Sequence, residues 1–176
     1  MKRFLLKKVL SKKLTFLFVA ALICLTSTAA FLFANADFSG EWKLNEQKSE
    51  LGQYGRMAAR TIKITSQPDA ISFERNVTAQ NGEERTVTEK LTFDGKETES
   101  APFGTAKKKS TAKWTDDGQT LNVNSVITFD RNGETMEIKV AEAYKLIDNG
   151  QGLSIESNST SSFGTNTMKL VYDKVK

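Results

Sequence analysis

The sequence contains no histidine, and its single cysteine, Cys24, lies in an apolar leader. Ser–His and Cys–His nucleophile–base pairs are therefore excluded, and zinc, copper and haem lose their usual protein ligands. The sequence also has no GxGxxG or phosphate-loop motif. Aspartate and glutamate are plentiful, but no spacing singles out a catalytic pair of carboxylates. We therefore predict no enzyme activity, no catalytic residues, no metal site and no cofactor.

The N-terminal segment has the layout of a secretory signal peptide. Residues 1–13 carry six basic side chains and no acidic one, and residues 14–36 are uncharged. The segment ends in Ala34-Asn35-Ala36, the small-x-small pattern that precedes a signal-peptidase cut. We predict a signal peptide over residues 1–36, cleavage near Ala36 and a periplasmic or secreted protein. The alternative is an uncleaved inner-membrane anchor, because about 20 apolar residues span a bilayer.

Two further classes are disfavoured by the leader and by the charge balance. Ile23 precedes Cys24 where a lipoprotein signal requires a small residue, so Cys24 is predicted to be an apolar leader residue. The whole chain has a net charge of +4, but residues 37–176 hold 19 basic and 21 acidic residues. That part of the chain lacks the basic surface typical of nucleic-acid binding. Its 140 residues form one predicted domain, stabilised by its core rather than by disulfides.

The predicted domain alternates short turn signals with strand-like runs. The turn signals are Pro68-Asp69, Asn81-Gly82, Asp94-Gly95, Asp116-Asp117-Gly118, Asn132-Gly133 and Asp148-Asn149-Gly150. The runs between them are rich in Thr, Val, Ile and Phe with a period of two residues, which indicates strands. Strands are predicted at 38–44, 60–65, 71–79, 85–93, 107–114, 120–129, 134–146, 152–158 and 167–174. Two acidic turns do not continue into a twelve-residue calcium loop, so we predict turns there.

This pattern predicts an all-β, antiparallel up-and-down meander of about 8–10 strands that closes into a barrel, because closure removes exposed strand edges. Residues 46–60 are predicted to be a short helical or irregular segment after the first strand. Residues 157–167, SNSTSSFGTNT, are predicted to be a loop or a frayed hairpin. The basic run at residues 107–109 is predicted to be a solvated start of a strand.

Four charged side chains share the apolar face of their predicted strands. Because side chains alternate along a regular strand, these charges point where their apolar neighbours point. An unpaired buried charge costs several kcal/mol, so each must pair, reach an open end or line a wet cavity. A position near a strand end, or a bulge that shifts the alternation, is the competing explanation. The four residues are Arg75, Arg85, Glu89 and Glu142.

We therefore predict a barrel that binds or carries a small, mainly apolar or amphipathic ligand in its interior. Arg75, Arg85, Glu89 and Glu142 are the predicted polar anchors, and Phe73, Phe93, Tyr144 and Tyr172 the predicted wall residues. The alternative is a barrel filled by its own side chains that contacts an envelope partner through its outer surface. In either case, membrane contact is expected only through an uncleaved leader.

The stretch FSGEWKLN, residues 38–45, carries a family resemblance. Gly40-Glu41-Trp42 resembles the glycine-x-tryptophan signature that opens the calycin barrels, the lipocalins and the fatty-acid-binding proteins. Residues 171–174, VYDK, are similar to the closing strand of the fatty-acid-binding proteins. The whole of residues 37–176 is most similar to small exported bacterial lipocalin-like proteins of unassigned function. The resemblance implies structural roles, with Trp42 plugging the closed end and Gly40 allowing a close strand approach.

The sequence also departs from these families at two positions. Fatty-acid-binding proteins hold a carboxylate with an arginine two residues before a tyrosine on the last strand. Here the tyrosine is matched by Tyr172, but Leu170 stands at the arginine position. The lipocalin arginine that packs over the tryptophan is also missing, and Lys169 and Lys174 are the nearest basic residues. The resemblance therefore implies a fold and names no ligand.

Overall fold

A computed structural model describes residues 34–52, 54–78 and 82–176, which belong to one compact unit, Ala34–Lys176. Most of the predicted signal peptide lies outside the described residues. Of its last residues, Ala36 donates its backbone N–H to the carbonyl of Gly118 over 2.8 Å. Within the described ranges, no helix is both long and apolar enough to cross a membrane.

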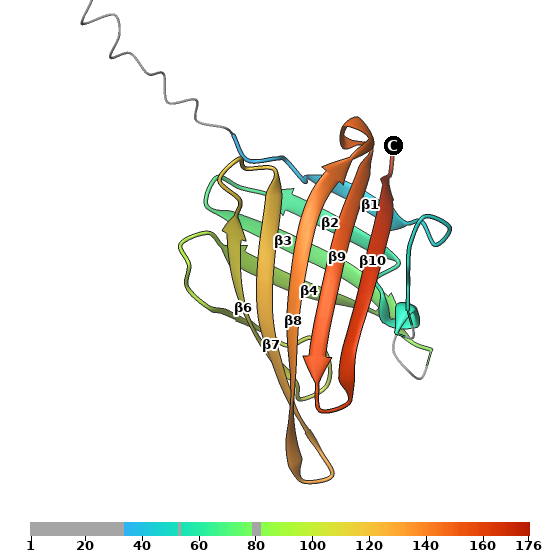
Figure 1. Ribbon diagram of the computed structural model, residues 1–176, viewed down its shortest axis with the longest axis vertical. Helices are drawn as coiled ribbons and strands as arrows, with labels where there is room; N and C mark the ends of the chain where they lie inside the picture. Colours follow the sequence, from blue (N-terminus) through green and yellow to red (C-terminus); the bar gives the residue numbers. More distant parts are fainter. Residues whose placement is uncertain (1–33, 53, 79–81) are drawn as a thin grey trace, which may run out of the picture. The chain divides into compact units, whose positions relative to one another are not determined.

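Ten antiparallel strands form one sheet that curls into a nearly closed barrel, as predicted (Figure 1). Strands that are neighbours in sequence pair with each other, except β4 and β5, which form the two ends of the sheet, and β1 also pairs with β10. In Figure 1, β6–β10 lie in front of β1–β4 and cross them. The strands are β1 (Gly40–Leu44), β2 (Thr61–Ser66), β3 (Ala70–Thr78), β4 (Glu84–Thr92), β5 (Thr98–Ser100), β6 (Lys107–Trp114), β7 (Thr120–Arg131), β8 (Glu134–Ile147), β9 (Gly152–Ser161) and β10 (Gly164–Lys174).

Two local predictions differ from the structure. The loop or frayed hairpin predicted at 157–167 is wrong, because β9 and β10 pair in regular register as far as Ser161 opposite Gly164. Serine and threonine side chains alternate there, and the backbone ladder does not depend on their polarity. Strand β5 was not predicted, because three residues are too few to display alternation. The short helical segment after β1 is present as η1 (Gly55–Met57).

The turn between β7 and β8 is built as its sequence predicts. Asn132 and Gly133 adopt positive φ angles of 54° and 84°. Two consecutive positive φ angles match the right-handed twist of the flanking strands. A second short helix, η2 (Asp148–Gly150), connects β8 to β9.

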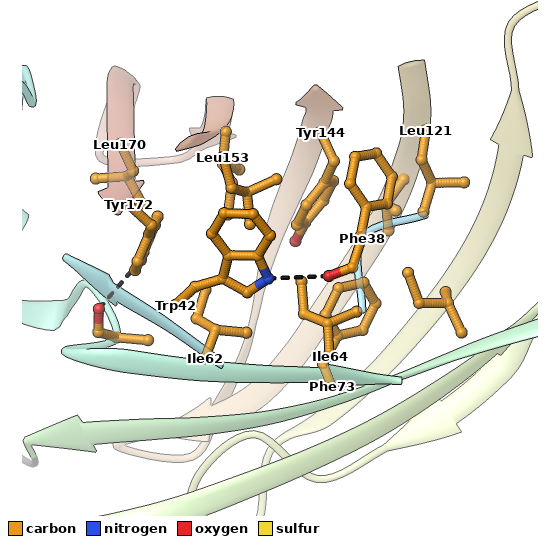
Figure 2. Packing of buried hydrophobic residues seen from close by; sticks show 14 of the residues in the cluster. Phe38, Trp42, Ile62, Ile64, Phe73, Leu121, Tyr144, Leu153, Leu170 and Tyr172 are labelled. Atoms are coloured by element: carbon orange, nitrogen blue, oxygen red, sulfur yellow. Dashed lines mark hydrogen bonds between the residues drawn. The ribbon is translucent and has the colours of Figure 1, made fainter. Parts of the chain in front are cut away.

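Trp42 lies in the buried core of the barrel, and the plugging role that the resemblance implies stays a prediction. The Trp42 side chain is fully buried, and its indole Nε1 donates to the carbonyl of Phe38 over 2.9 Å (Figure 2). The Phe38 ring in turn stacks on Trp114, with ring centroids 5.3 Å apart. Tyr172 and Leu153 belong to the same buried cluster. We call this region the tryptophan end.

Gly40 and Lys174 lie against each other beside Trp42. Gly40 has a φ of +140°, and a β-carbon at this position would lie 3.0 Å from Cε of Lys174. The Lys174 ammonium lies 5.2 Å from the centroid of the Trp42 ring. Lys174 therefore places a cation over the Trp42 ring. A cation over an indole face is attracted by the ring quadrupole.

Candidate functional site

A layer of charged side chains crosses the barrel interior next to the apolar core. Strand alternation places Arg75 on the inner face of β3, one inward position beyond the buried Phe73. Its guanidinium lies 4.3 Å from the centroid of the Phe73 ring and donates from Nη1 to Glu89 Oε2 over 2.9 Å. The two charges that the sequence placed mid-strand on the apolar face therefore neutralise each other.

Glu89 is the most fully bonded member of this layer. Besides Arg75, its carboxylate accepts hydrogen bonds from Lys108 Nζ over 2.9 Å and from Ser110 Oγ over 2.8 Å. Ser110 Oγ has one hydrogen, which it donates to Glu89. In the 3.0 Å hydrogen bond between the two hydroxyls, Ser125 Oγ is therefore the donor and Ser110 Oγ the acceptor. Strands β4 and β5 are the two edges of the sheet and do not pair with each other, which leaves a seam in the barrel. The contacts of Glu89 with Lys108 and Ser110 link β4 to β6 across this seam.

The layer continues from Arg75 to the other side of the barrel. Arg75 Nη2 donates to the Tyr144 hydroxyl over 2.8 Å, and that hydroxyl donates to Glu142 Oε2 over 3.1 Å. Tyr144 and Glu142 are consecutive inward residues of β8. The chain of contacts Glu89–Arg75–Tyr144–Glu142 therefore spans from β4 to β8. We call these residues, with Lys108, Ser110 and Ser125, the polar layer.

The charges of the polar layer stabilise one another. Burial alone would raise the pKa of Glu89, but Arg75 and Lys108 outweigh it and hold this pKa below its usual value. Burial likewise lowers the pKa of Arg75, yet Tyr144, Glu89 and Glu142 raise it overall. For Tyr144, burial raises the pKa well above its ordinary value. Arg75 and Glu89 are therefore charged and Tyr144 is neutral at pH 7.

The other predicted site residues lie outside the polar layer. Phe73 is buried in the core, and the Tyr172 hydroxyl donates to the Ala59 carbonyl over 3.1 Å (Figure 2). Phe93 packs edge-on against Trp114, with ring centroids 5.7 Å apart. Arg85 lies at the start of β4 and is exposed, as the strand-end explanation expected. The roles of these residues in ligand binding stay predictions.

Sequence reasoning missed Lys108, Ser110 and Ser125. Lys108 lies in the basic run at residues 107–109, which was predicted to be a solvated strand start; that prediction is wrong for Lys108, which is only 12% exposed. Its neighbours in the run are exposed, because alternation turns Lys107 and Lys109 outward. The shared alternation of Lys108 with Ser110 and Ala112 was the available signal.

Beyond the polar layer, the inner face of the barrel is apolar but only partly buried. Four inward residues carry this feature, and we call them the inner wall: Val87, Ile127, Ile138 and Val140. Ile127 lies opposite both Lys108 and Ile138, and Val140 is the inward residue that precedes Glu142 on β8. Inward residues toward the tryptophan end, such as Leu121 and Tyr144, are fully buried. The inner wall is therefore reached by solvent although it faces inward.

An open groove of about 390 Å³ lies on the opposite, outward face of β6–β9. Its lining includes Lys109, Asn124, Lys139, Ala141 and Asn158, which are mainly polar and share the outward face by register. Ser125 and Val140, which alternation places on the inward face, also border the groove. None of the predicted anchors lines this groove. Among the described residues, no cluster of carboxylates could hold a metal ion.

Comparisons with known proteins bear on the fold. No protein-family model matches the sequence, and no curated protein matches it. One solved structure, a zebrafish ileal bile acid-binding protein complexed with cholic acid, matches with a TM-score of 0.50 at 17% sequence identity. The match covers 78% of this chain and 98% of that one. Together with the ten-stranded meander, this similarity shows that the chain folds as a calycin-like β-barrel.

Proposed function

We propose that this protein binds a small, mainly apolar molecule inside its barrel, against the inner wall, and acts as a binding or carrier protein rather than as an enzyme. The observation that carries the proposal is the partial exposure of Val87, Ile127, Ile138 and Val140, which face inward. Apolar inward side chains that solvent reaches gain free energy when a ligand covers them, by roughly 25 cal/mol for each Å² removed from water.

Two further observations support the proposal. The polar layer ends the apolar wall with a few fixed hydrogen-bonding groups, which is how small-molecule sites combine affinity with orientation. The solved structure of similar fold is a bile acid-binding protein complexed with cholic acid. Because residues 1–36 are predicted to be a signal peptide, we also propose that the protein binds its ligand outside the cytoplasm, after export.

Titration with N-phenyl-1-naphthylamine, an uncharged dye that fluoresces in apolar surroundings, tests the proposal. We expect saturable binding to the purified protein. Ile138→Trp places a large ring on the inner wall and should weaken dye binding by about tenfold or more. Ala141→Trp, three positions along the same strand, places the same ring in the outward groove and should leave binding unchanged. Absence of saturable binding would refute the proposal, and loss of binding only in Ala141→Trp would move the site outside.

The closed network of the polar layer favours one alternative, a barrel that needs no ligand and contacts a partner through its surface. Arg75 and Glu89 already neutralise each other without help from a ligand. Small barrels are also often filled by their own side chains. The dye titration separates the two functions, because a filled barrel gives no saturable signal that Ile138→Trp abolishes.

A further inference from the structure

Glu142 differs from the other carboxylate of the polar layer, Glu89, because most of its hydrogen-bond acceptor positions are unused. Within the part of the chain that the structure describes, Glu89 accepts from three donors, whereas Glu142 accepts from Tyr144 alone. Among the described residues, Glu142 forms no ion pair. An ionised carboxylate has room for about four hydrogen bonds. Glu142 therefore keeps free acceptor positions inside the barrel.

The position of Glu142 directs these free acceptors toward the inner wall. Glu142 is partly exposed, whereas Tyr144, the following inward residue on β8 toward the tryptophan end, is fully buried. The next inward residue in the other direction is Val140, a member of the inner wall. A molecule that lies on the inner wall with its polar group toward the polar layer would meet Glu142 there.

A ligand carboxylate would find poor surroundings in the same place. Arg75 shares the Tyr144 hydroxyl with Glu142, and its Nη1 and Nη2 already donate to Glu89 and Tyr144. Glu89 and Glu142 flank Arg75, and both raise its pKa by their negative charge. Lys108 is engaged by both oxygens of Glu89, each 2.9 Å from its Nζ. An incoming anion would have to approach two carboxylates in partly desolvated surroundings, where like charges repel strongly.

We infer that the ligand has an apolar body and a hydrogen-bond donor as its polar end, a primary ammonium above all, which binds to Glu142. This inference rests on the proposed function, because it requires a molecule on the inner wall. A charge-assisted hydrogen bond between an ammonium and a carboxylate is stronger than a neutral one. A ligand with an ammonium end should therefore bind more tightly than one with a hydroxyl end.

Displacement of bound N-phenyl-1-naphthylamine at pH 7 tests the inference with three probes of equal chain length. Dodecylamine should displace the dye at a concentration at least about tenfold lower than laurate, with 1-dodecanol between them. Glu142→Gln should remove the preference for the amine. Glu137→Gln, a matched loss of one carboxylate on the outward face of the same strand, should keep it.

The outcomes separate this inference from the proposed function. A dye that does not bind overturns both. A dye that binds and is displaced by laurate as readily as by dodecylamine overturns the inference alone, and so does a preference that survives in Glu142→Gln. If Glu142→Gln does not fold, as its circular dichroism would reveal, the ranking of the three probes on the unmodified protein decides.

Discussion

The guanidinium of Arg75 and the carboxylate of Glu89 form an ion pair of 2.9 Å inside the barrel, with side-chain exposures of only 15% and 3%. Burying two charges costs several kcal/mol each, and their mutual attraction repays that cost only when further hydrogen bonds complete the geometry. Here Lys108, Ser110 and Tyr144 provide those bonds. Whether the Arg75–Glu89 pair stabilises the protein therefore depends on these neighbouring residues, and substitutions can measure its contribution.

Glu89→Gln is expected to destabilise the protein strongly. The amide keeps the shape of the side chain but leaves Arg75 and Lys108 buried without their carboxylate. Removing one member of a buried ion pair costs about 3–5 kcal/mol. Replacing all three residues with apolar ones, Arg75→Met with Glu89→Leu and Lys108→Met, leaves no member of the pair stranded and should cost less. Urea denaturation followed by circular dichroism measures both values.

A surface ion pair provides the control for this experiment. Lys96 and Asp94 lie 2.9 Å apart, and the Lys96 side chain is 81% exposed. Solvent screens such a pair, so Asp94→Asn should leave the urea midpoint close to that of the unmodified protein. A triple apolar variant less stable than Glu89→Gln would show that the polar layer contributes net stability.

The stability that Glu89 contributes should disappear in acid. Its pKa is lower in the folded protein than in the unfolded chain, so the unfolded chain binds more protons as the pH falls below about 4.3. The free energy of unfolding therefore falls with pH through that range. The difference in stability between the unmodified protein and Glu89→Gln should be complete above about pH 5 and shrink toward pH 3. A difference that stays constant from pH 7 to pH 3 would contradict the assignment.

The strand alternation made the polar layer partly predictable. Arg75, Glu89 and Glu142 were placed on the inner face because a regular strand turns every second side chain to the same side. Which of them meet depends on how the sheet curls, since the Arg75–Tyr144 contact joins residues 69 positions apart. No local sequence pattern shows which strands meet across the barrel. The sequence therefore allowed three outcomes for Arg75 and Glu89: pairing with another charge, reaching an open end, or lining a wet cavity.

The residues that were missed have physical reasons of their own. Lys108 contacts Glu89 across the seam where β4 and β5 leave the sheet unpaired, and the sequence does not mark that seam. The inner wall was visible as alternating apolar residues, but its partial exposure was not. Alternation assigns a residue to a face, whereas exposure depends on what fills the space opposite.

The two tryptophans should respond differently to replacement by phenylalanine. Trp42 Nε1 donates to the Phe38 carbonyl over 2.9 Å, whereas the buried Nε1 of Trp114 has no hydrogen-bond partner among the described residues. Trp42→Phe loses packing and a buried hydrogen bond, which together cost about 2 kcal/mol or more. Trp114→Phe loses packing but removes an unsatisfied donor, so it should be less destabilising by about 1 kcal/mol. Urea denaturation of both variants checks the order, and equal losses would contradict the role assigned to the Phe38 carbonyl.

Gly40→Ala should destabilise the first strand through its backbone rather than through its contact with Lys174. The φ angle of +140° at Gly40 is one that residues with a β-carbon rarely adopt, and the strain costs about 1 kcal/mol or more. The new methyl would also lie 3.0 Å from Cε of Lys174, but that atom ends a flexible side chain and can move aside. The double variant Gly40→Ala with Lys174→Ala should therefore remain at least as unstable as Gly40→Ala in urea denaturation. Recovery of stability in the double variant would instead identify crowding by Lys174 as the reason for glycine at this position.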